Sequence, residues 1–159
     1  MNTAADDPTI EYAGFWVRVG ASLIDTVLML IVTTPLIVAV YGWDSLFTDT
    51  LLRGPLDLVI SWIFPAAAVI LFWIYKQATP GKMALSLRVV DADSGAPLSS
   101  RQSIVRYLGY FVAMIPLGIG LIWVGFSSKK QGWHDLLANT VVVRAKNRGT
   151  EPVRFLQYK

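Results

Sequence analysis

The sequence predicts an all-α membrane protein with two transmembrane helices, a third hydrophobic segment that is broken or re-entrant, and a small cytoplasmic β-sheet. Composition is the first observation behind this prediction. The 159 residues are 54% hydrophobic and 16% charged, with a mean hydropathy of +0.51, whereas soluble domains carry about 25% charged residues. The second observation is that the apolar residues are concentrated in three long segments. We therefore treat residues 1–159 as one membrane domain.

The two predicted transmembrane helices cover residues 19–41 and 58–75. The first contains one charged residue, Asp25, and the second contains none. At ~1.5 Å per residue, each is about long enough to cross a hydrocarbon layer ~30 Å thick. The N-terminus lacks the basic start, short apolar core and cleavage site of a signal peptide, so the first helix is expected to remain as a membrane anchor.

The third hydrophobic segment, residues 107–128, has Pro116, Gly118 and Gly120 at its centre. Proline and glycine break or kink helices. The segment therefore either dips into the membrane and returns as a re-entrant hairpin, or crosses once as a kinked span. The distribution of charge around it favours the hairpin.

Lysine and arginine are distributed unevenly around the three segments. One precedes the first segment and one lies in the first loop, but five lie in the second loop and seven follow the third segment. The positive-inside rule places the second loop and both termini in the cytoplasm, at what we expect to be a bacterial inner membrane. Because these residues flank apolar segments, anionic lipid headgroups are the expected partner, and nucleic acid is not.

Two stretches of the chain predict β-structure. Residues 84–99 have the pattern of a strand, a turn at 91–95 and a short second strand, and residues 139–146 are a β-branched run. An isolated hairpin is marginal in water, so we expect the two stretches to pair in a small sheet. Pairing requires both on one side of the membrane, which again favours a third segment that returns.

Asp25 is the residue that most needs an explanation. A carboxylate inside a membrane helix costs roughly 2.5–3.5 kcal/mol, so it must face protein or water. Arg18 lies seven residues earlier on nearly the same face, with Ser22 between them. Helical side chains lean toward the N-terminus, so a direct pair is strained, and Ser22, water or another segment would complete the contact. Asp25 is either a functional group or one that fastens helices together.

The single histidine, His134, stands beside Asp135. Gly132 precedes them, and Asp135 can cap a short helix. The pair is either an interfacial hydrogen-bonding group or a cytoplasmic proton relay. One histidine without cysteine offers no metal-ligand spacing, and no nucleophile–base pair is present. The sequence therefore predicts no metal site, no cofactor and no enzyme.

Three stretches resemble the RDD family, which is named for one arginine and two aspartates. The stretch YAGFWVRVGASLID resembles the family's opening and places the arginine on Arg18 and the first aspartate on Asp25. The middle stretch is similar to the family's T-x-G-K turn followed by L-R-V-V-D and G-x-P-L-S. The closing stretch, residues 131–143, places the second aspartate on Asp135.

The resemblance covers about residues 12–144, which leaves polar tails at 1–11 and 147–159. One departure is Asn139, where the family usually has glycine, and this weakens a predicted turn. The resemblance implies a membrane-embedded protein; members have been suggested to transport ligands, some look like cation/proton antiporters, and others are accessory parts of larger assemblies. The candidate interface or structural residues are Lys82, Arg88, Pro116, Gly118 and Gly120.

Two functional hypotheses from different classes follow. The first is a cation/proton antiporter-like transporter, in which Asp25 alternates between a proton and Na⁺, K⁺ or Li⁺, Ser22 adds an oxygen ligand, and His134 and Asp135 form the relay. Two spans and a hairpin cannot enclose a pathway alone, so this hypothesis predicts a homo-oligomer. The second is a non-catalytic accessory or scaffold subunit of a larger membrane complex, with Arg18, Asp25 and Asp135 as a buried polar network that fixes helix register.

Overall fold

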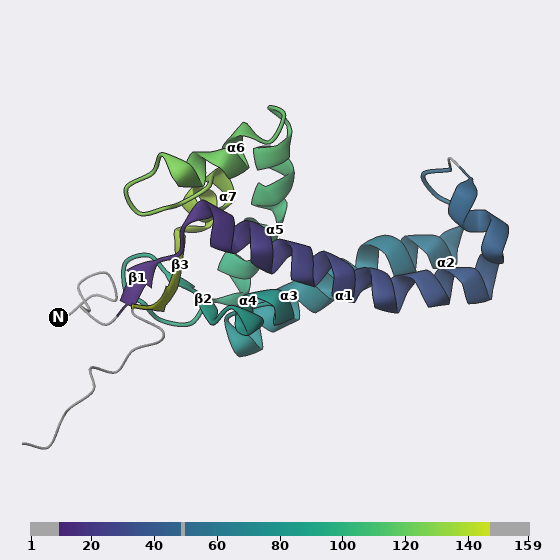
Figure 1. Cartoon of the computed structure of the whole chain (residues 1–159), viewed down its shortest axis with the longest axis horizontal. Helices are drawn as coiled ribbons and strands as arrows, with labels where there is room; N and C mark the ends of the chain where they lie inside the picture. The colour runs from purple at the N-terminus through teal and green to yellow at the C-terminus, as the bar shows by residue number, and fades with distance from the viewer. Residues whose placement is uncertain (1–9, 49, 147–159) are drawn as a thin grey trace, which may run out of the picture.

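A computed structural model of the chain describes residues 10–48 and 50–146. The predicted polar tails therefore lie almost wholly outside the described residues. The described part is mostly helical and carries a three-stranded sheet at one end, which confirms the predicted fold class (Figure 1). In chain order its elements are β1 (Ile10–Tyr12), α1 (Phe15–Tyr41), η1 (Trp43–Phe47), α2 (Pro55–Leu58), η2 (Val59–Ile63), α3 (Phe64–Lys76), α4 (Pro80–Ala84), β2 (Leu87–Asp91), α5 (Ser100–Met114), α6 (Ile119–Ile122), η3 (Trp123–Gly125), α7 (Trp133–Ala138) and β3 (Thr140–Ala145).

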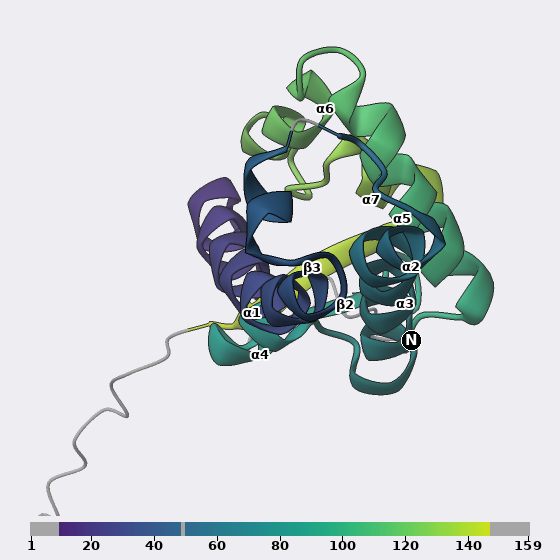
Figure 2. The ribbon, with the colours of Figure 1, turned by 90° about the vertical axis from the view of Figure 1, so that its right-hand side faces the viewer.

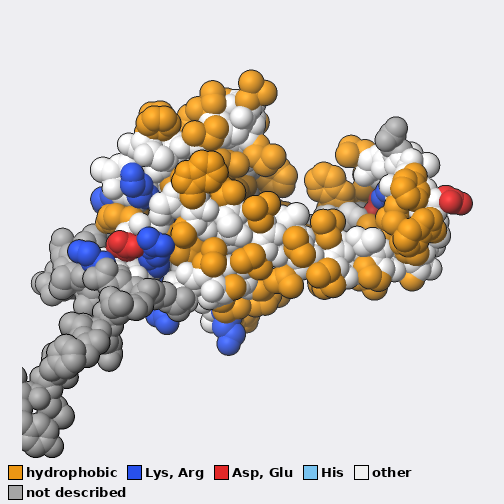
Figure 3. All heavy atoms as spheres, viewed as in Figure 1, with side chains coloured by type: hydrophobic (Ala, Val, Ile, Leu, Met, Phe, Trp, Pro, Cys, Tyr) orange, Lys and Arg blue, Asp and Glu red, His pale blue; other side chains and the backbone are white. Residues whose placement is uncertain are grey.

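Two helices are long and apolar enough to cross a membrane. The first is α1, with 27 residues, and the second runs for 22 residues from Pro55 to Lys76 through α2, η2 and α3. Both extend along the long axis, with the sheet at one end and η1 at the other (Figure 1). Large apolar side chains on both spans are exposed, and they cover the visible face of the spans while Lys and Arg gather near the sheet (Figure 3). Such an apolar surface is suited to lipid.

Both spans accommodate a proline. Pro35 lies inside α1, where the helix continues and the nearby Thr33 hydroxyl donates to the Met29 carbonyl at 2.9 Å. In the second span, Pro65 is the second residue of α3, which begins where the π-helical turn η2 ends. A proline ring clashes with the carbonyl four residues earlier, and the wider π turn moves that carbonyl away.

The third hydrophobic segment is broken, as predicted. Helix α5 ends at Met114, and α6 with η3 continues in a direction that differs by 117°. Pro116 lies in the break, and the two residues after it, Leu117 and Gly118, have positive φ angles of 54° and 77°. A helix cannot continue through left-handed residues, and a bend beyond a right angle turns the second piece partly back along α5.

The sheet is antiparallel, with strand order β1-β3-β2. Val89 of β2 is paired with Val142 of β3, and Tyr12 of β1 is paired with Val143. Strand β1 precedes α1, β2 follows the second span and β3 follows the third segment. Because the three strands form one sheet, these three parts of the chain lie on one side of the molecule. This arrangement fits two crossings followed by a segment that returns. Viewed along the spans, α1, α3 and α5 stand around a common interior with α6 to one side (Figure 2).

One predicted strand is wrong and another was missed. The turn at 91–95 is present, closed by the Gly95 amide on the Asp91 carbonyl at 3.0 Å, but no second strand follows it. Ser99 instead forms a capping box with Gln102 at the start of α5, and Pro97 has no N–H to give to a ladder. The third strand is β1, which the acidic N-terminal sequence did not suggest.

Candidate functional site at the sheet end of the spans

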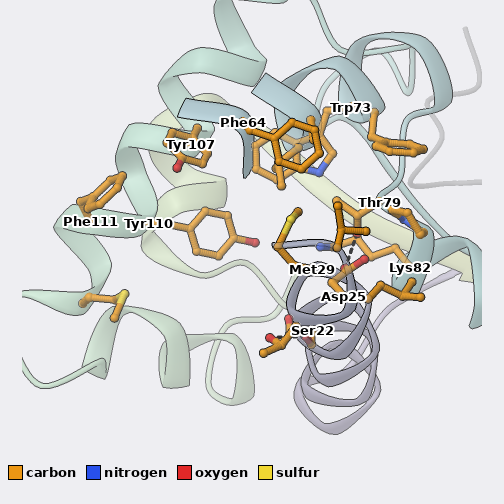
Figure 4. Close-up of a pocket in the computed structure, with 18 residues that line it drawn as sticks. Ser22, Asp25, Met29, Phe64, Trp73, Thr79, Lys82, Tyr107, Tyr110 and Phe111 are labelled. Atoms are coloured by element: carbon orange, nitrogen blue, oxygen red, sulfur yellow. Dashed lines mark hydrogen bonds between the residues drawn. The ribbon is translucent and has the colours of Figure 1, made fainter. Parts of the chain in front are cut away.

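A cavity of about 470 Å³ lies between α1, α3 and α5. Its walls are mostly apolar and aromatic, including Phe64, Trp73 and Phe111, as Figure 4 shows. Polar side chains gather toward the sheet end, where Asp25 and Lys82 both line the cavity. An apolar cavity with a few convergent polar groups is the usual form of a small-molecule or ion site.

Asp25 is bonded to the start of α4. One carboxylate oxygen accepts from the Thr79 hydroxyl at 2.5 Å and the other from the Gly81 amide at 2.7 Å (Figure 4). Gly81 allows this approach because a Cβ there would lie 2.1 Å from the Ala21 carbonyl oxygen. The turn after the second span is therefore a short helix whose Gly81 N–H, together with the Thr79 hydroxyl just before the helix, meets a carboxylate of α1. That contact is electrostatically favourable at a helix N-terminus.

Arg18 pairs with Asp135 rather than with Asp25. Its guanidinium donates to the Asp135 carboxylate at 2.6 Å, to the Lys130 carbonyl at 2.5 Å and to the Ala13 carbonyl at 3.0 Å. Arg18 is 8% exposed and Asp135 is fully buried. The arginine and second aspartate of the RDD motif thus connect the first turn of α1 to α7, although 117 residues separate them.

Arg106 of α5 is the third member of a buried ion cluster with Arg18 and Asp135, and the sequence pattern does not predict this role. It is fully buried, is paired with the other oxygen of Asp135, and donates to the Thr140 hydroxyl at 2.5 Å. Its guanidinium carbon lies 5.2 Å from the centre of the Trp73 ring, a cation–π distance. A signal did exist: the buried residues Ser103, Arg106, Gly109 and Ala113 share one helical face, so the arginine lies on the small-residue face of α5.

The ion cluster determines the charge of α7. Burial raises the pKa of Asp135, but Arg106 and Arg18 outweigh it and hold that pKa well below its ordinary value, so Asp135 is ionised. Burial lowers the pKa of His134 from 6.5 to about 3. The charges of Arg106 and Arg18 lower this pKa further, and together these effects outweigh Asp135, which raises it. The imidazole is therefore neutral at physiological pH. It stacks on Tyr110, with ring centres 3.9 Å apart.

The remaining candidates have different surroundings. Lys82 is 5% exposed and lines the cavity, whereas Arg88 is exposed on β2. Pro116 and Gly118 lie in the break after α5. Gly120 packs closely, since a Cβ there would lie 2.7 Å from Ala113 Cα. Ser22 lines the cavity beside Asp25.

A second polar cluster closes the opposite end of the spans. Asp57 accepts from the Arg53 backbone amide at 3.0 Å and from the Ser61 hydroxyl at 2.6 Å, and its own amide donates to the Tyr41 hydroxyl at 3.0 Å. The Arg53 guanidinium reaches the Ser45 carbonyl at 2.7 Å. This cluster fastens the loop between the two spans. Across residues 10–48 and 50–146, no three His, Cys, Asp or Glu side chains are grouped so that they could hold a metal ion.

Comparisons with known proteins agree with this architecture. The sequence profile of the RDD family matches residues 12–139. An uncharacterized membrane protein of Bacillus subtilis (strain 168), YteJ, is 33% identical over 143 residues, which cover 87% of this chain and 84% of that protein. An uncharacterized protein of the same bacterium, YckC, is 30% identical over 141 residues, covering 84% of this chain and 85% of the relative.

An uncharacterized protein of Rickettsia prowazekii (strain Madrid E) is 42% identical over 76 residues, and the match spans 48% of this chain but only 42% of that relative's length. No solved structure matches the fold. The profile match takes in Arg18, Asp25 and Asp135, the three charged residues around which the sheet end is built. On this evidence the chain is an integral membrane protein that belongs to the RDD family.

Proposed function

We propose that the protein exchanges cations for protons across the membrane, with Asp25 as the exchanging carboxylate. The observation that carries the proposal is the contrast among its carboxylates. Asp57 and Asp135 are buried and are paired with arginine, whereas none of the ion pairs among the described residues includes Asp25, which lines the cavity. Asp25 is thus a half-buried carboxylate that has no cationic partner among the described residues and is open to an incoming cation.

The surroundings of Asp25 suit a hard cation. Ser22 and Thr79 place hydroxyl oxygens on the same cavity, and alkali cations prefer oxygen ligands. Lys82 adds a positive charge to that cavity. An entering cation therefore favours the departure of a proton, which keeps the total charge constant. Because two spans and a broken segment do not surround a complete pathway, the proposal includes a homo-oligomer.

Cation-driven proton flux in liposomes tests the proposal. Wild-type protein is compared with Asp25→Asn, which keeps one oxygen for Thr79 or Gly81 but cannot exchange a proton. Asp44→Asn, at an exposed position in η1, is the matched control. We expect flux in the wild type and the control and none in folded Asp25→Asn. Wild-type liposomes that show no flux with Na⁺, K⁺ or Li⁺ would overturn the proposal.

The second candidate is an accessory or scaffold subunit, and one observation favours it. Asp25 already accepts two short hydrogen bonds, and these fasten α1 to α4. If this role is correct, the wild type shows no cation-driven proton flux, and Asp25→Asn lowers the melting temperature. Affinity purification of the full chain in mild detergent would then recover a stoichiometric membrane partner, and a chain that purifies alone would argue against this role.

The location in the inner membrane, with the sheet end in the cytoplasm, is part of the proposal. It rests on the basic residues that surround the sheet. The chain has no cysteine, so single cysteines report sidedness cleanly. We expect Thr50→Cys to react with an impermeant maleimide in cells whose outer membrane is permeabilised, and Lys146→Cys to react only after lysis. The reverse labelling pattern would invert the topology.

A further inference from the structure

A second cavity, of about 400 Å³, lies beside the first, on the side of α1 that faces α5, α6 and α7. Three of the residues that line it are cationic: Arg18, Lys82 and Arg106. No carboxylate lines it, and the His134 imidazole on its wall is neutral. The cavity is therefore positively charged, unlike the cavity that contains Asp25.

Two of these cations have unused hydrogen-bonding capacity. Lys82 is 5% exposed, and its ammonium makes no hydrogen bond or ion pair with any residue that the structure describes. Arg106 is fully buried, and its Nε and Nη2 atoms have no hydrogen-bond partner within residues 10–48 and 50–146. Buried charges in proteins are normally paired. An unpaired ammonium on a cavity wall is thus an observation that points to an anionic ligand.

The charge balance gives the number of negative charges that are missing. Arg18, Lys82 and Arg106 contribute three positive charges, and the two nearby carboxylates, Asp25 and Asp135, contribute two negative ones. Asp135 is shared between the two arginines. One positive charge is left over, and a single monoanion would balance it.

We propose that this cavity binds a phosphate oxyanion, supplied by the phosphodiester of an anionic phospholipid. The oxyanion contacts the Lys82 ammonium, with the Ser22 hydroxyl as a further donor on the same wall. The fully buried Arg106 guanidinium adds positive charge behind that wall. A phosphodiester carries one negative charge, which is the charge that the cluster lacks. Charge-assisted hydrogen bonds of this kind are about twice as strong as neutral ones.

Depth and wall chemistry favour a lipid over free phosphate. A helix of 27 residues is ~40 Å long, about 10 Å longer than the hydrocarbon layer, so the first turns of α1 lie at headgroup level. The rest of the cavity wall is mostly apolar, with Phe15, Val19 and Leu23 on one side and Leu121 and Ile122 on the other. Such a wall suits the glycerol and upper acyl carbons of a lipid and gives nothing to inorganic phosphate.

Thermal unfolding of the full chain in dodecyl maltoside tests the site. The protein is titrated with phosphatidylglycerol, with phosphatidylcholine of the same acyl chains, or with inorganic phosphate. We expect phosphatidylglycerol to raise the melting temperature most. Lys82→Met should raise the half-saturating concentration at least ~10-fold, while Lys76→Met, an exposed lysine at the end of α3, leaves it unchanged.

A structural role for Lys82 gives a different result. If Lys82 is an unpaired cation awaiting a ligand, Lys82→Met without lipid is at least as stable as the wild type, because a buried charge has been removed. A structural lysine would lower the melting temperature in that condition. Ser22→Ala, at an exposed helix position, weakens the response to phosphatidylglycerol by a smaller factor and serves if Lys82→Met does not fold.

The outcomes separate the sources of phosphate and the two proposals. If only inorganic phosphate stabilises the protein, and Lys82→Met abolishes that effect, the oxyanion site stands but its ligand is not a lipid. Equal responses to both lipids that Lys82→Met does not reduce would overturn the site. Flux reports on exchange at Asp25, whereas the effect of Lys82→Met on the response to phosphatidylglycerol reports on the oxyanion site, so either proposal can fail while the other stands.

Discussion

Replacing Asp135 with asparagine should destabilise this fold more than the same change at Asp25. Asp135 is fully buried and balances two guanidinium groups, those of Arg18 and Arg106. Asparagine keeps one oxygen for the Gly132 amide, now 2.9 Å from the carboxylate, but leaves both buried cations uncompensated. Removing one member of a buried ion pair costs about 3–5 kcal/mol. At Asp25, which is half-buried, the change weakens hydrogen bonds only, worth about 1–3 kcal/mol.

Equilibrium unfolding in mixed micelles of dodecyl maltoside and SDS measures both changes, with Asp44→Asn as the exposed control. A double-mutant cycle makes the test specific. Arg106→Gln with Asp135→Asn should lose less than the sum of the single changes, by roughly 0.5–3 kcal/mol, because the two residues are in contact. An Asp135→Asn variant as stable as the control, or a cycle that is additive, would refute the view that this cluster holds the sheet end together.

Two further predictions concern α7 and α4. Because burial depresses the pKa of His134 to about 3, the unfolded chain binds a proton below pH 6.5 that the folded chain does not, so stability falls as the pH falls. This contribution amounts to about 2 kcal/mol between pH 7 and pH 5. His134→Phe keeps the stacking on Tyr110 and should make the unfolding free energy less dependent on pH over that range. An unchanged pH dependence in this variant would contradict the neutral imidazole. Gly81→Ala should cost at least about 2 kcal/mol, because the new Cβ meets the Ala21 carbonyl oxygen, whereas Gly125→Ala, with no atom within 4 Å, should be silent in the same melting experiment.

The features that the sequence predicts well are those set by local chemistry. The break in the third segment follows from Pro116 and Gly118, and the two spans follow from uninterrupted apolar runs. Asn139 ends α7 in the left-handed conformation, with φ of 51°. Glycine, which the family usually has here, adopts the left-handed conformation readily, and asparagine also tolerates it. The departure at Asn139 therefore leaves the turn intact.

The features that the sequence does not predict depend on contacts between distant segments. The partner of Arg18 lies on α7 and the partners of Asp25 lie on α4, and no spacing within α1 reveals either contact. Arg106 was counted with the second loop because hydropathy placed the third segment after it. In the structure α5 begins at Ser100, so Arg106 lies within the helix. A buried cation needs a buried anion, but this rule alone does not single out Asp135 as the partner of Arg106.

The two aspartates of the RDD motif therefore have different electrostatic roles. Asp135 is held ionised by two guanidinium groups and has no freedom to change its charge without destabilising the fold. Asp25 is held by a hydroxyl and a backbone amide, neither of which carries a charge. Protonation of Asp25 would weaken its bond to the Gly81 amide and loosen α4, the helix that carries Lys82. A proton at Asp25 is thus coupled to the position of the one cation that lines both cavities, which links the exchange proposed at the first cavity to the lipid phosphate proposed at the second.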